Sequence, residues 1–244
     1  MTYCVGVLVR DGLAMLADTR TNAGVDNISS YRKLRVFGGD GERLIIVASA
    51  GSLSTTQCAL ELACTGICAR DTQVTESILT APSIHRAAYL LGEAVRRTRE
   101  DMERLKARDV DFDATLLVGG SVRGEATRLF LVYGAGNFIE CDEDTPYFQI
   151  GETKYGKPIL DRALTFSTGL EEALKIALIS FSSTMRSNLA VGLPIDLVTA
   201  QPGACAAELF HRIEKDEPYF RELNDRWSDA LRAAQASIPP PPYR

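Results

Sequence analysis

Histidine is scarce in this sequence, and long apolar runs are absent from it. The 244 residues include only two histidines, His85 and His211, which leaves a Ser-His-Asp or Cys-His hydrolase without a plausible base. Neither histidine has metal-ligand spacing from a pair of cysteines, so we expect no metal and no other cofactor. Because no run approaches roughly 18 apolar residues, we expect no membrane span either.

Excess positive charge and export signals are also missing. With 27 Lys and Arg against 32 Asp and Glu, the net charge of −5 argues against nucleic-acid binding. Arg96, Arg97 and Arg99 form the one basic cluster, and acidic residues at helical spacing interrupt it, which is typical of a solvated helix face. No basic segment followed by an apolar one opens the sequence, so we expect no secretory signal. The six cysteines then indicate reduced thiols in a cytoplasmic protein.

The most informative residue that is present is Thr2. Once Met1 is removed, Thr2 carries a free α-amino group and a β-hydroxyl, so one residue supplies a nucleophile and its own base. An N-terminal amine has a pKa of about 7.7–8.0, so a good share of it is neutral near pH 7 and can accept a proton. Threonine after methionine is common, however, because small second residues permit methionine removal, and its position alone does not identify a nucleophile.

Strand-like segments follow Thr2 directly. Residues 3–9 and 13–17 predict a hairpin across the turn Arg10-Asp11-Gly12, which would bring Asp18 near the start of the first strand. Residues 22–33 indicate a loop, and the other segments predicted as strands are 34–37, 44–50, 113–122, 126–133, a short one near 148, and 195–199. Helices are predicted from residue 52 to about 70 and at 83–106, 157–164, 170–186 and 217–236. This order predicts one layered α+β domain over residues 1–238, followed by a Pro-rich tail at 239–244.

Several segments resemble proteasome-type β subunits, which belong to the N-terminal nucleophile hydrolases. The resemblance rests on Thr2, on Asp18-x-Arg20, on Lys33 and on Ala50-Gly51-Ser52 before the first helix. Three longer segments are similar to the bacterial Anbu (ancestral beta subunit) group: residues 21–29, 136–140 and 149–160. The resemblance implies a four-layer αββα sandwich across nearly the whole chain.

The resemblance also implies a catalytic role for four of these residues. Thr2 Oγ would attack a peptide carbonyl, and its α-amine would act first as the base and later as the acid. Lys33 would lower the cost of the alkoxide, and Asp18 would hold Lys33 charged and correctly placed. The backbone amide of Gly51 would face the tetrahedral oxyanion.

The function so implied is that of a threonine-type endopeptidase. It would cleave peptide or protein substrates within a self-compartmentalising homo-oligomer, either a ring or an open spiral, with Arg20 and Asn22 shaping the loop beside the substrate. Two alternatives stay open: an N-terminal nucleophile amidase that acts on a small amide, and a weakly active or inactive assembly protein that keeps the fold. Whether an ATPase partner feeds the assembly is also open.

The residues expected behind the threonine depart from those of active proteasome β subunits. In those proteins a serine between two glycines and an Asp-x-x-Ser-Gly segment support the threonine. Here Glu152 stands at the first position, and Asn188 and Val191 replace the aspartate and the serine of the second. Glu152 is either a surface loop residue or a member of the site, where a carboxylate near the amine raises the pKa of that amine.

Overall fold

Two antiparallel five-stranded sheets form the centre of the protein. The computed structural model describes residues 2–22, 28–104 and 111–243, to which all structural statements refer. The first sheet has the order β12-β1-β2-β13-β14, with bounds Tyr147–Gly151, Tyr3–Val9, Gly12–Asp18, Ile195–Ala200 and Leu209–Ile213. The second has the order β11-β10-β9-β6-β5, with bounds Phe138–Glu140, Arg128–Val132, Ala114–Val122, Arg43–Gly51 and Leu34–Gly38. The predicted mixture of helices and sheets is confirmed.

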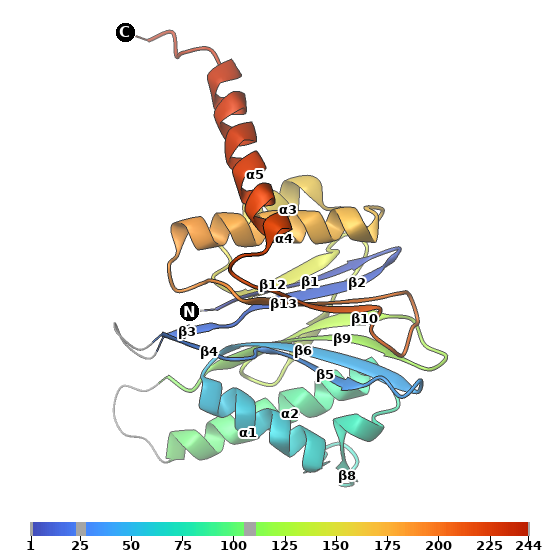
Figure 1. Ribbon diagram of the computed structural model, residues 1–244. Helices are drawn as coiled ribbons and strands as arrows, with labels where there is room; N and C mark the ends of the chain where they lie inside the picture. The colour runs from blue at the N-terminus through green and yellow to red at the C-terminus, as the bar shows by residue number, and fades with distance from the viewer. Residues whose placement is uncertain (1, 23–27, 105–110, 244) are drawn as a thin grey trace.

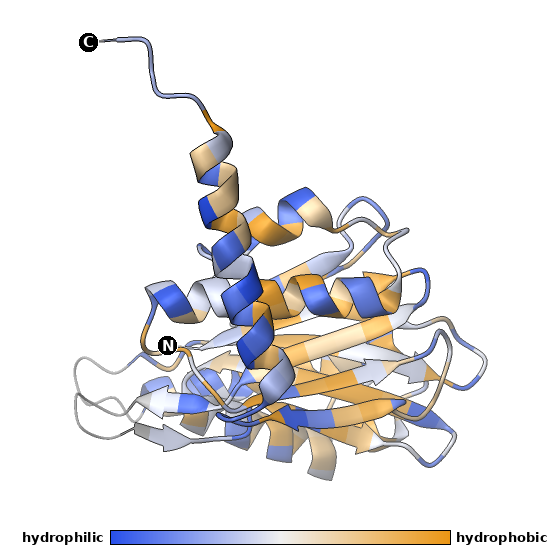
Figure 2. Cartoon of the chain, turned by 45° about the horizontal axis from the view of Figure 1, so that its top comes forward, coloured by the Kyte–Doolittle hydropathy of each residue, from blue (hydrophilic) through white to orange (hydrophobic). Residues whose placement is uncertain are grey.

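The two sheets face each other, and helices lie on both outer faces (Figure 1). Helices α1 (Leu53–Thr65) and α2 (Ile84–Arg104) pack on the second sheet, whereas α3 (Lys157–Ala163) and α4 (Leu170–Ser187) pack on the first. A separate apolar cluster, which includes Leu13, Met15, Ile46 and Leu117, fills the space between the sheets. Figure 2 shows the apolar residues concentrated in the strands. Burial on both faces explains why strands such as β2 consist almost entirely of apolar residues.

The hairpin predicted at the start of the chain is confirmed. Strand β1 pairs with β2 in a register that places Cys4 opposite Ala17, so Asp18 lies beside the first residues of β1. The predicted loop at residues 22–33 is wrong in part, because β3 (Arg20–Asn22) pairs with β4 (Ile28–Ser30); residues 23–27 lie outside the described residues.

Local pattern also misplaces the end of one helix and misses one edge strand. Helix α1 ends at Thr65 and not near residue 70, because Gly66 adopts a φ of +124° that other residues rarely tolerate. The chain continues as β7 (Ile67–Cys68), which pairs with β8 (Thr75–Glu76) and precedes a 3-10 turn at Ile78–Thr80. His211 lies in the edge strand β14, in a segment for which the sequence predicted no strand.

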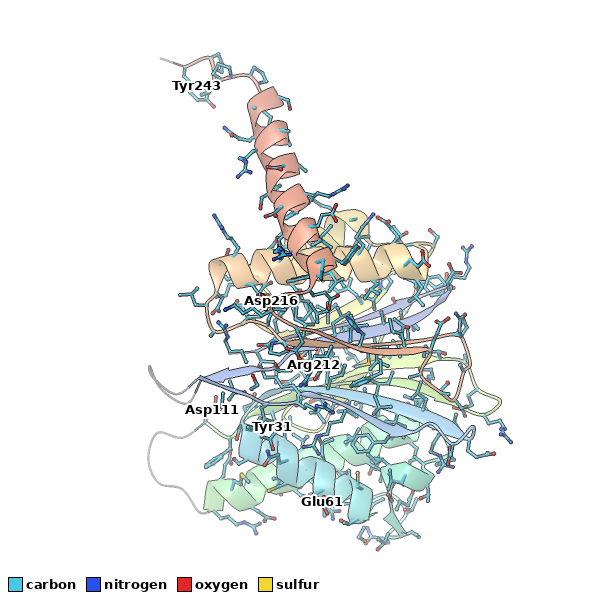
Figure 3. The ribbon with its side chains drawn as sticks, in the orientation of Figure 1. Tyr31, Glu61, Asp111, Arg212, Asp216 and Tyr243 are labelled. Atoms are coloured by element: carbon cyan, nitrogen blue, oxygen red, sulfur yellow. The ribbon has the colours of Figure 1, made fainter. Side chains whose placement is uncertain are left out.

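Helix α5 (Pro218–Ser237) begins against α4 and then projects from the body (Figure 1). Phe220 and Leu223 are buried near its start, and the Trp227 indole donates a hydrogen bond to Ser183 Oγ. Figure 3 shows Tyr243 in the tail beyond the far end of the helix. None of the helices described has the length and apolar character that crossing a membrane requires.

Candidate active site

Thr2 is held at the start of the first sheet by backbone contacts on either side of it. Its carbonyl oxygen accepts a hydrogen bond from the amide of Glu152 at 2.7 Å. The amide of the next residue, Tyr3, donates to Asp18 Oδ1 at 3.1 Å. The residue is only 8% exposed. Chain ends normally fray unless they are tied down, and these contacts tie down this one.

Behind Thr2 lies a buried ion pair between Asp18, the last residue of β2, and Lys33, which directly precedes β5. Lys33 Nζ is 2.7 Å from Asp18 Oδ1, and the same ammonium donates to the carbonyl oxygen of Arg20 at 2.6 Å. Asp18 Oδ2 accepts a longer bond of 3.4 Å from the amide of Gly192. Burial raises the pKa of the Asp18 carboxyl, and the charge of Lys33 and the amides of Tyr3 and Gly192 oppose that rise. The ionised state of Asp18 therefore depends on Lys33.

Gly51 is the last residue of β6 and stands where the strand turns into α1. Its φ is +103°, and a Cβ atom added there would lie 2.3 Å from the carbonyl oxygen of Asp113. That same oxygen accepts a hydrogen bond from the Ser52 amide at 2.8 Å, and Ser52 Oγ accepts one from Thr55 to cap the helix. The junction therefore admits only glycine. Strand β6, which leads into this junction, also contacts the ion pair, because the amide of Ser49 donates a hydrogen bond to the carbonyl of Lys33 at 3.0 Å.

Glu152 and Asn188 meet on the other side of Thr2. Glu152 is 4% exposed and is therefore not a surface loop residue. Its Oε2 accepts a hydrogen bond of 2.9 Å from Asn188 Nδ2, and Asn188 Oδ1 in turn accepts one from the Ala190 amide. Gly151, with a φ of +85°, turns the chain after β12 and directs residue 152 inward.

The two residues expected in the substrate loop begin the β3–β4 pair. Arg20 Nη1 donates to the carbonyl of Leu189 at 2.8 Å, so Arg20 ties β3 to the segment that follows α4. Asn22 ends β3, and its side chain lies outside the described residues. Val191, in the same segment after α4, is buried in the core beneath the first sheet.

The structure thus connects Thr2, Asp18 and Lys33 by direct contacts or through one residue. Sequence reasoning missed the amides of Tyr3 and Gly192 as partners of Asp18. Backbone donors carry no signal in the residue type, so only the paired strands could have shown them. Among the described residues, no group of three or more His, Cys, Asp or Glu side chains is arranged to hold a metal ion.

Two facing sheets, a threonine ahead of the first strand and a buried Asp–Lys pair behind it define a proteasome-type β subunit. Anbu (ancestral beta-subunit) from Yersinia bercovieri is 44% identical with a TM-score of 0.89, over 99% of this chain and 100% of that one. Anbu from Hyphomicrobium sp. strain MC1 is 45% identical with a TM-score of 0.88, over 99% and 100%. The chain in the helical assembly of the Anbu complex from Pseudomonas aeruginosa is 42% identical with a TM-score of 0.87, over 98% of each.

The protein belongs to the Anbu family. No protein-family model and no curated protein sequence matches the chain.

Proposed function

We propose that this protein is an N-terminal threonine hydrolase of the proteasome type, in which Thr2 cleaves amide bonds after Met1 is removed. The observation that carries the proposal is the buried Asp18–Lys33 pair, whose carboxylate also binds the amide that follows Thr2. Buried ion pairs are weak stabilisers, so stability alone does not explain why an Asp–Lys pair is buried next to the start of the first strand.

The proposed chemistry assigns one step to each of these groups. The α-amine of Thr2 takes the proton of its own hydroxyl while Oγ attacks the carbonyl carbon of the substrate. The resulting oxyanion accepts a hydrogen bond from the backbone amide of Gly51, and the charge of Lys33 stabilises the alkoxide. Two unit charges 4 Å apart interact by roughly 4 kcal/mol at an effective dielectric constant of 20. The protonated amine then gives its proton to the leaving amine as the C–N bond breaks. Water hydrolyses the ester that remains on Thr2.

We further propose that residues 1–238 form one four-layer αββα sandwich, followed by the Pro-rich tail at 239–244. The three apolar clusters support this, because one lies between the sheets and the other two lie between a sheet and its helices. The six free cysteines support a cytoplasmic location.

The protein is also proposed to act as a homo-oligomer, in a ring or an open spiral, on peptide or protein substrates. The Pseudomonas aeruginosa relative forms a helical assembly, as its description states. Helix α5 supports self-association, because Leu231 on its projecting part is 51% exposed and Ile238, directly after the helix, is 70% exposed. Size-exclusion chromatography with light scattering measures the oligomeric state directly.

Labelling with a peptide epoxyketone tests the catalytic proposal, since such electrophiles react with an N-terminal threonine through both its hydroxyl and its amine. Intact-mass spectrometry should show loss of Met1 and one adduct per chain, and Thr2→Ala should abolish the adduct. The control Thr65→Ala, at the exposed end of α1, should label normally. Retention of Met1, or undiminished labelling of Thr2→Ala, would refute the proposal.

A weakly active or inactive assembly protein is the second candidate. It is favoured by the support residues behind Thr2, because a buried carboxylate stands at position 152 where active proteasome β subunits have serine. Profiling with peptides and with small amides separates three outcomes: peptide cleavage, small-amide cleavage only, and neither.

A further inference from the structure

Glu152 is a buried carboxylate whose nearest counter-charge among the described residues sits on an exposed side chain. Its hydrogen-bond partner, Asn188, is neutral. The nearest cation is Lys154, whose Nζ lies 3.6 Å from Glu152 Oε1 while 75% of its side chain is exposed to water. A buried carboxylate is costly unless it is both hydrogen-bonded and paired with an opposite charge. A second, buried cation beside Glu152 would therefore lower that cost.

Thr2 occupies the position that faces Glu152. In the ladder between β1 and β12 the last pair is Tyr3 with Gly151, and just beyond it the Glu152 amide donates a hydrogen bond to the Thr2 carbonyl at 2.7 Å. The backbone nitrogen of Thr2 thus belongs to a buried residue that is in direct backbone contact with Glu152, itself buried. As long as Met1 is attached, that nitrogen belongs to a neutral amide.

We infer that Glu152 is the counter-ion of the Thr2 α-ammonium group, which forms when Met1 is removed, and that this pair sets the pH at which the threonine becomes nucleophilic. The second part rests on the proposed function, whereas the ion pair itself does not. Asn188 orients the carboxylate, so both are positioning residues.

The other charged side chains near Thr2 do not cancel the effect of Glu152 on the pKa of the α-amine. Asp18 and Lys33 neutralise each other at 2.7 Å, and the guanidinium of Arg20 binds the Leu189 carbonyl. Lys154 is mostly in water, where its charge is screened. An opposite charge within about 4–6 Å shifts a pKa by about 1–3 units toward the charged form. The α-amine should therefore titrate at least one unit above the usual 7.7–8.0, and its neutral fraction at pH 7 should fall about tenfold or more.

The test uses the full chain released with Thr2 as its first residue by cleavage of an N-terminal fusion, so that the α-amine is present whether or not Met1 is removed in cells. Acetylation with limiting acetic anhydride across pH 6–11, read by mass spectrometry of the N-terminal peptide, gives the pKa of the α-amine. Glu152→Gln is nearly isosteric and keeps an oxygen for Asn188. Glu171→Gln removes an exposed carboxylate on α4 as a matched control, and Lys154→Gln removes the competing cation.

The inference expects the α-amine pKa to fall by one unit or more in Glu152→Gln, to stay unchanged in Glu171→Gln, and to stay raised in Lys154→Gln. An amine that titrates at 7.7–8.0 in the unsubstituted protein, or a pKa that Glu152→Gln leaves unchanged, overturns it. Circular dichroism checks that Glu152→Gln is folded; should it not fold, the pKa of the unsubstituted amine still decides.

Epoxyketone labelling of the same samples separates this inference from the proposed function. A raised α-amine pKa with no labelling at any pH supports the ion pair and refutes the hydrolase. Labelling that follows an ordinary amine pKa refutes the ion pair and supports the hydrolase. If the ion pair and the hydrolase activity are both present, the labelling rate at pH 7 should rise about tenfold in Glu152→Gln.

Discussion

Replacing Lys33 with methionine removes the ammonium group that neutralises Asp18, and the resulting loss of stability should depend strongly on pH. Both side chains are buried, and methionine keeps nearly the same volume, so the change leaves little cavity. Burial already raises the pKa of the Asp18 carboxyl above its ordinary 3.8. Without Lys33 the pKa should rise further, and the folded protein should hold the proton at neutral pH.

The expected magnitude follows from the proton that the folded state must keep. Holding a proton on a carboxyl whose unfolded pKa is 3.8 costs about 1.4 kcal/mol for each pH unit above that value. The cost is thus about 1 kcal/mol at pH 4.5 and at most about 5 kcal/mol at pH 7.5, which agrees with about 3–5 kcal/mol for breaking a buried ion pair. Losing the hydrogen bond from Lys33 to the Arg20 carbonyl adds about 1 kcal/mol at either pH.

The sign of the pH dependence is set by which state binds more protons. Because the pKa of Asp18 is higher in the folded state, the folded protein binds more protons between the two pKa values. The free energy of unfolding gained from the proton on Asp18 is therefore complete below pH 3.8, and it is lost as the pH rises through the pKa of Asp18 in the folded state. The variant should therefore be less stable than the unsubstituted protein by about 3–5 kcal/mol at pH 7.5 and by only about 1–2 kcal/mol at pH 4.5.

Urea unfolding at fixed protein concentration, followed by the fluorescence of Trp227, the only tryptophan, measures both values. Lys175→Met, in the exposed pair with Glu172, should change the free energy of unfolding by less than about 0.5 kcal/mol at either pH. A loss for Lys33→Met that is the same at the two pH values, or that is below about 1 kcal/mol at pH 7.5, would refute the reasoning.

The junction glycine and the cysteines give two further predictions. Gly51→Ala should lower the free energy of unfolding by at least about 2 kcal/mol and by more than Gly39→Ala, because both have a positive φ but an added Cβ meets a backbone oxygen at 2.3 Å only at Gly51; equal costs in urea unfolding would contradict the steric argument. Burial raises the pKa of the Cys141 thiol to about 12, so at pH 8 a thiol reagent should modify the exposed Cys58 and Cys68 first and Cys141 only on unfolding, as peptide mass spectrometry would show.

Local signals in the sequence predict the parts of the fold that position Thr2. The alternation of strand and turn residues in the first hairpin is enough to place Asp18 beside the start of β1, and Ser52 marks the start of α1 as its N-cap. Local signals fail where the secondary structure of a segment depends on a strand far away in the sequence. His211 lies in a strand because β14 pairs with β13, where Arg212 forms a two-bonded ion pair with the buried Asp196; Figure 3 shows Arg212 beside the sheets.

In the candidate site, too, some residues can be predicted from the sequence and others cannot. Resemblance to a family indicates Thr2, Asp18 and Lys33, because their side chains carry the chemistry. It leaves Glu152 undecided, since burial at that position results from the pairing of β12 with β1, about 150 residues earlier in the chain. The amide of Gly192 binds Asp18 from a segment 174 residues away, and no residue type signals a backbone donor.

Asp18 links the stability of the fold to the site, and this decides which substitutions can test the chemistry. Its two carboxylate oxygens bind the Tyr3 amide, the Lys33 ammonium and the Gly192 amide, which come from three separate segments. Any replacement of Asp18 or Lys33 therefore weakens the fold, and lost activity in such a variant cannot be assigned to catalysis. Thr2, by contrast, is held through its own carbonyl and the next amide, neither of which an alanine changes. Thr2→Ala should remain folded, so any loss of labelling in that variant reports on the hydroxyl itself.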